Sequence, residues 1–127
     1  MAQQLAAFAS AQQQQITGRI PKAVTGVLND DTLVLTLYDA LTPGEQALAR
    51  HEIGAAQVEA LHKQLFSTSM APMRREIKRV TGRAVREMAL DVASGTGAII
   101  RPFTNGTLVQ VYLLRSEEES AISADGG

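Results

Sequence analysis

The stretch from residue 41 to residue 80 constrains the fold more than any other part of this chain, because both of its ends carry helix signals. Thr42 has the chemistry of an N-cap, and Pro43 suits the first helical position, where a missing N–H costs nothing. Glu45 is placed to return a capping-box hydrogen bond. Gly82 is the expected residue just beyond the C-terminus. We therefore expect one long helix, or two helical segments in tandem, over this stretch.

Apolar residues follow two separate registers in this stretch. The first register consists of Val58, Leu61 and Leu65. The second has 4-3-4-3 spacing and consists of Phe66, Met70, Met73, Ile77 and Val80. Pro72 lies inside the second register, where it would lose a helical hydrogen bond and clash with the preceding turn, so we expect a kink or break near residues 67–71. The pattern lasts too few turns for a coiled coil and favours a helix packed on its own sheet.

The segments on either side are predicted to form a helix and several strands. Residues 2–17 carry a thin apolar stripe at helical spacing that ends at Gly18. Residues 23–28 and 32–38 flank a turn at 29–31 whose Asn and Asp residues tolerate positive φ, which predicts a hairpin. Strands are also expected over 84–92 and 107–114, with a short additional strand possible at 98–103.

The order α-ββ-α-ββ predicts an α+β fold: a two-layer sandwich with a mostly antiparallel sheet and a long kinked helix on one face. We expect a single domain over 1–115 and an acidic, disordered tail over 116–127. The second sheet face would carry Val34, Tyr38 and some of Val109, Val111 and Leu113. Because such a face is apolar, we expect a second copy to cover it and the protein to form a homodimer.

Several function classes find no support in the sequence. The chain has no cysteine, which excludes thiolate catalysis and disulfides. Net charge is −1, and no apolar run reaches the roughly 18 residues of a membrane span, so we expect a soluble cytoplasmic protein without membrane insertion.

Catalytic and metal-binding patterns are also missing from the sequence. His51 and His62 are three helical turns apart, too far to share a metal, and we expect both to be exposed. The acidic residues are scattered and favour a solvated surface. The Ser94–Gly97 turn is no P-loop, although its backbone could face an anion of a small-molecule substrate. We expect no enzyme activity and no cofactor.

One basic cluster supplies half of all Lys and Arg within thirteen residues. It consists of Arg74, Arg75, Lys78, Arg79, Arg83 and Arg86. These residues could bind an acidic partner, anionic headgroups or RNA, whereas the alternative is a solvated helix face with charges that suit the helix C-terminus. With two Tyr, three Phe and no Trp, the chain has no obvious platform for stacking bases.

Five short motifs lie along the chain: GRIP at 18–21, DDTLVLTL at 30–37, LTPGE at 41–45, REIKRVTGR at 75–83 and ALD at 89–91. With these motifs the sequence resembles the MpsC-like family, small proteins named after a sodium-translocating, membrane-potential-generating system. The resemblance runs from Gly18 to Leu114, departs at the Gln-rich first helix and at 94–106, and carries no catalytic residues. It implies a non-enzymatic cytosolic accessory or regulatory protein of a membrane ion or inorganic-carbon transport system, with a membrane transporter as a possible partner. The alternative is a nucleic-acid-binding or ribosome-associated module that uses the basic cluster.

Overall fold

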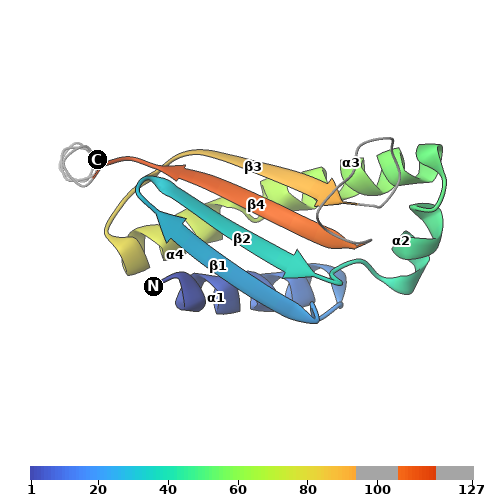
Figure 1. Cartoon of the computed structure of the whole chain (residues 1–127), viewed down its shortest axis with the longest axis horizontal. Coiled ribbons are helices and arrows are strands. Elements are labelled where there is room, and N and C mark those ends of the chain that lie inside the picture. Colours follow the sequence, from blue (N-terminus) through green and yellow to red (C-terminus); the bar gives the residue numbers. More distant parts are fainter. Residues whose placement is uncertain (94–105, 117–127) are drawn as a thin grey trace.

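The computed structural model describes residues 1–93 and 106–116 and confirms the α+β fold. Figure 1 shows one sheet with α1, α3 and α4 behind it and α2 at one end. In chain order the elements are α1 (Ala2–Thr17), β1 (Ala23–Asn29), β2 (Thr32–Tyr38), α2 (Pro43–Leu48), α3 (Glu52–Thr68), α4 (Met70–Thr81), β3 (Val85–Ala93) and β4 (Thr107–Leu114). The predicted turn at 94–97, the possible strand at 98–103 and the tail from residue 117 lie outside the described residues.

The sheet consists of two strand pairs, β1–β2 and β3–β4, which are joined through β2 and β4. Its order is β1-β2-β4-β3, and every neighbouring pair is antiparallel. Leu33, Leu35 and Leu37 of β2 share one face, and all three are fully buried. On β4, Leu108 and Tyr112 lie opposite Leu37 and Leu33. The centre of the core therefore lies under β2 and β4.

The predicted helix signals are confirmed at both ends of the central stretch. The Thr42 hydroxyl accepts the Glu45 N–H at 3.2 Å, and the Glu45 carboxylate accepts the Thr42 N–H at 2.9 Å. Pro43 begins α2. Gly82 follows α4 with φ +74°, a left-handed conformation that glycine adopts without steric cost. Local sequence rules therefore fix where this stretch starts and stops.

The sequence predicted one long kinked helix or two segments in tandem, but the central stretch is three helices. The predicted break is present at Ser69, between α3 and α4. A second break separates α2 from α3, where the chain turns so tightly that a Cβ on Gly54 would lie 2.0 Å from the Leu48 carbonyl oxygen. The end of α2 and the start of α3 are thus in close contact at this second break, which the sequence analysis did not predict.

The buried face of α3 also differs from the expected one. Val58, His62 and Phe66 point into the protein, whereas Leu61, expected in the first apolar register, is 43% exposed. The second register is confirmed at Met73 and Ile77, which are buried on α4. The helices therefore present an apolar layer to the sheet, although α3 includes a histidine in that layer.

The opposite sheet face is of mixed polarity and lies on the side away from the helices (Figure 1). Val27, Val34, Val111 and Ala89 form one continuous cross-strand row on it, and Val27 is 60% exposed. The expected homodimer stays a prediction. Within residues 1–93 and 106–116, no helix combines the length and apolar character that crossing a bilayer requires.

Candidate functional site

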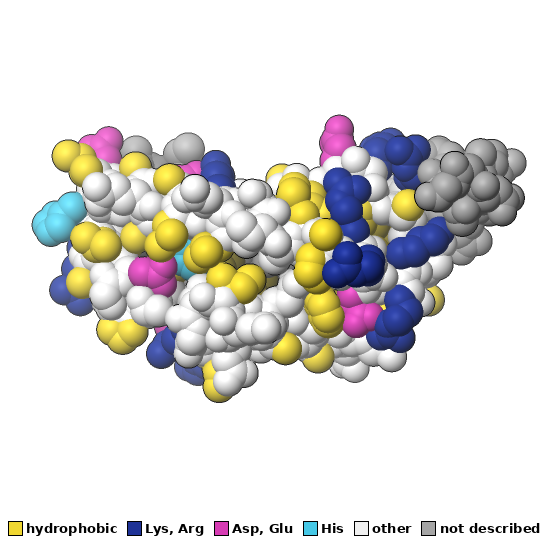
Figure 2. Space-filling model, turned by 180° about the vertical axis from the view of Figure 1, so that it is seen from behind, with side chains coloured by type: hydrophobic (Ala, Val, Ile, Leu, Met, Phe, Trp, Pro, Cys, Tyr) yellow, Lys and Arg dark blue, Asp and Glu magenta, His cyan; other side chains and the backbone are white. Residues whose placement is uncertain are grey.

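The basic cluster predicted from sequence lies on α4 and the start of β3. α4 is strongly amphipathic, with Met73 and Ile77 buried and Arg74, Arg75 and Arg79 on its exposed side. Figure 2 shows Lys and Arg side chains, in dark blue, gathered at one end of the helix side of the molecule. The structure therefore brings most of the predicted cations onto one surface.

Three of these cations are engaged locally. Arg74 donates from Nη1 to the Val85 carbonyl at 3.2 Å, and Lys78 donates to the Gly82 carbonyl at 3.2 Å, at the end of its own helix. Arg79 pairs with Glu76, and this hydrogen bond raises the pKa of the guanidinium. These contacts fit the alternative of a helix face that satisfies its own C-terminus.

The Arg83 side chain contacts other segments of the fold. Its guanidinium donates to the Arg115 and Asp30 carbonyls, at 2.8 Å each, and pairs with the Asp31 carboxylate. Its side chain is only 12% exposed. Arg83 thus ties the start of β3 to the β1–β2 turn and to the end of β4.

Arg75 and Arg86 differ from the other members of the cluster. Both are exposed, and neither side chain has a partner among the described residues. Arg75 and Arg79 also line a shallow hollow with Phe8 and Pro72. A shallow surface that carries the unpaired guanidinium group of Arg75 suits contact with a carboxylate-rich or phosphate-rich partner rather than chemistry on a small molecule.

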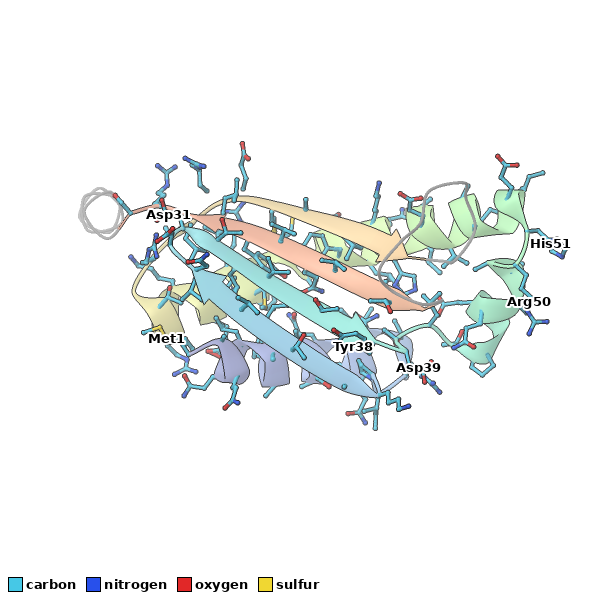
Figure 3. All side chains as sticks on the ribbon, in the orientation of Figure 1. Met1, Asp31, Tyr38, Asp39, Arg50 and His51 are labelled. Carbon is cyan, nitrogen blue, oxygen red and sulfur yellow. The ribbon has the colours of Figure 1, made fainter. Side chains whose placement is uncertain are left out.

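The two histidines have different environments. His51 precedes α3 and points away from the protein at the corner beside Arg50, as Figure 3 shows, and the prediction of an exposed residue is confirmed. The same prediction was wrong for His62, which is 2% exposed and whose Nε2 lies 2.7 Å from the Glu45 carboxylate. Glu45 therefore serves both the capping box of α2 and a buried contact to α3.

The environment of Glu45 shifts its pKa downward. Burial by itself raises the pKa of this carboxyl, but the Thr42 backbone hydrogen bond and the charge and hydrogen bond of His62 together lower it more. Glu45 is therefore held as a carboxylate. The pair binds α2 to α3 through charge as well as packing.

His62 also borders a narrow polar slot between α1, α3 and the sheet. Gln13 and Gln110 line it with more than nine-tenths of their surface buried, and Gln110 accepts a hydrogen bond from the Tyr112 hydroxyl at 2.7 Å. The enclosed space is about 10 Å³, which is about the least that a single water molecule requires and is too small for a metabolite. Among the described residues, no three His, Asp or Glu side chains gather to hold a metal ion.

Sequence reasoning missed the Glu45–His62 pair, although one signal was present. Val58, His62 and Phe66 recur at intervals of four, which places the histidine in a buried stripe. The sequence prediction placed Leu61 in the buried stripe instead, and it therefore expected His62 to be exposed. Its carboxylate partner lies seventeen residues away in a separate helix, and no local spacing connects the two.

One known protein family matches this chain. The family described as the Na+-translocating membrane potential-generating system (MpsC) matches residues 1–104. This chain belongs to the MpsC family. The match includes the Gln-rich first helix, which the five motifs had left outside the resemblance. MpsC is named for a system that moves Na+ and generates a membrane potential. No curated protein matches this MpsC-family chain, and no solved structure does.

Proposed function

We propose that this MpsC-family protein is a non-enzymatic cytosolic accessory protein of a membrane ion or inorganic-carbon transport system. In this proposal it docks on an acidic surface of a membrane transport protein through exposed cations of α4 and the start of β3. The observation that carries the proposal is the pair of exposed cations, Arg75 and Arg86, that have no partner among the described residues. Unpaired surface charge of one sign steers an oppositely charged partner.

The hydrogen bonds made by two acidic residues support an accessory role rather than catalysis. Glu45 is bound by Thr42 and His62, and Asp39 accepts hydrogen bonds from Arg19 and Gln46. General acid–base catalysis requires a carboxyl group that is free to exchange a proton with a substrate. The carboxylates named here instead stabilise the fold.

The test is affinity purification of the tagged protein in mild detergent from cells that normally make it. The double variant Arg75→Glu and Arg86→Glu reverses the proposed docking charges. We expect it to recover a membrane transport protein at roughly a tenth of the wild-type yield or less, because like charges in contact cost several kcal/mol.

The matched control is the double variant Arg50→Glu and Lys63→Glu, which reverses two exposed cations outside the basic cluster. It should recover the wild-type amount of partner. Equal recovery with both double variants would reject the α4 surface as the docking site. Salt-sensitive recovery of RNA in place of a membrane protein would support the nucleic-acid-binding alternative.

A further inference from the structure

The two edges of the sheet are built differently. The β3 edge carries a bulge between Val85 and Glu87, and charged side chains at Arg86 and Glu87, features that discourage pairing with another strand. The β1 edge pairs with β2 over seven uninterrupted residues, and Ala23–Asn29 contains neither charge nor proline. β1 therefore presents an unprotected edge that another strand can extend.

A groove of about 530 Å³ follows this edge between α1 and β1. Apart from Lys22, its walls are formed by uncharged and mostly small side chains. They include Ala6, Ala7 and Ser10 of α1, and Val24, Thr25 and Gly26 of β1. Helix α1 has no charged residue over its whole length. Depletion of charge is typical of the centre of a protein–protein interface, and the groove has room for the side chains of an added strand.

The sequence of β1 is complementary to itself. If two copies pair antiparallel about Gly26, Thr25 of each lies opposite Val27 of the other. Lys22 then lies opposite Asp30, since each is four residues from Gly26 in the chain. Both charged residues are exposed, and neither side chain has a partner among the described residues. The two-fold axis repeats this favourable pair at both ends of the interface.

We propose that two copies of this chain associate through their β1 edges, which joins their four-stranded sheets into one eight-stranded sheet. Backbone hydrogen bonds hold the strands together, and the Lys22–Asp30 pairs set the register. A second copy fits this edge better than an unrelated strand. Two copies form the Lys22–Asp30 pair at both ends of the interface, and no third chain is needed to supply a charge. The interface does not use Arg75 or Arg86, so it is independent of the proposed docking function.

The first test measures the mass of the untagged protein by sedimentation velocity at micromolar concentrations. We expect a dimer. Lys22→Glu replaces two attractive contacts with two repulsive ones and should weaken association about tenfold at low salt. Lys63→Glu makes the same change of charge on α3 and should leave association unchanged. A monomer throughout the concentration range, or equal weakening by both variants, would overturn the proposal.

The second test locates the interface by cross-linking. The chain has no cysteine, so each single-cysteine variant carries one reactive thiol. Thr25→Cys places two thiols as diagonal neighbours across paired β1 edges, about 7–8 Å apart, and a short bis-maleimide should link them. Ala89→Cys on β3 is the control and should stay unlinked. If Val111→Cys, in the open sheet face, cross-links while Thr25→Cys does not, the copies pack face to face and the edge proposal fails.

Discussion

Replacing Glu45 with alanine should lower the free energy of unfolding by roughly 2.5 kcal/mol, because this carboxylate joins two helices. Its Oε1 accepts the Thr42 N–H at 2.9 Å, and its Oε2 lies 2.7 Å from His62 Nε2. Loss of the capping-box hydrogen bond contributes about 1 kcal/mol. Loss of a charged hydrogen bond to a buried ring contributes about 1.5 kcal/mol more.

Urea denaturation at pH 7 measures this loss. For a domain of this size the slope is about 1–3 kcal/mol per molar urea, so the midpoint should fall by roughly 1 M. Glu59→Ala is the matched control, since Glu59 also pairs with a cation on α3, at 3.0 Å from Lys63, but with 43% of its side chain exposed. A surface pair of this kind contributes about 0.3–0.5 kcal/mol.

The pH dependence of the Glu45 effect has a defined sign. The folded-state pKa of Glu45 lies below its ordinary value of 4.5, so the carboxylate adds stability that is fully present above that value. This stability is lost as the pH falls through the folded-state pKa. The difference between wild type and Glu45→Ala should therefore be largest at neutral pH and shrink in acid. A loss below about 0.5 kcal/mol at pH 7 would refute the reasoning, as would a difference that grows in acid.

Three further changes separate local conformation from tertiary contact, each measured by urea or thermal unfolding. Gly82→Ala should cost about 1 kcal/mol because φ is +74°, whereas Gly44→Ala, also in open space, should cost nothing. Equal effects would contradict the backbone argument. Gly54→Ala should cost about 2 kcal/mol, since its Cβ would meet the Leu48 carbonyl, and a neutral result would exclude this close approach. Arg83→Ala should cost about 1.5 kcal/mol and Arg86→Ala under about 0.5, and the reverse order would show that Arg83 is not the tie between strands.

Local sequence rules were sufficient for the elements whose signals are contained within a few residues. The capping box of Thr42 and Glu45 and the left-handed Gly82 were predictable because each depends on backbone groups three or four residues away. The buried face of β2 was predictable because side chains alternate along a strand. The family resemblance rested on the same kind of short local pattern.

Contacts between different secondary-structure elements decided the rest. The break between α2 and α3 arises where Gly54 meets the Leu48 carbonyl, and His62 became a buried partner of Glu45 only when that turn brought the two helices together. Likewise, sequence placed Arg83 and Arg86 in one basic cluster, but the fold ties Arg83 to the β1–β2 turn and leaves Arg86 exposed. By itself the sequence determined the helix ends and strand faces, because these depend on neighbouring residues. The tertiary structure alone decided which charged side chains are held and which are exposed, because that depends on segments far apart in the chain.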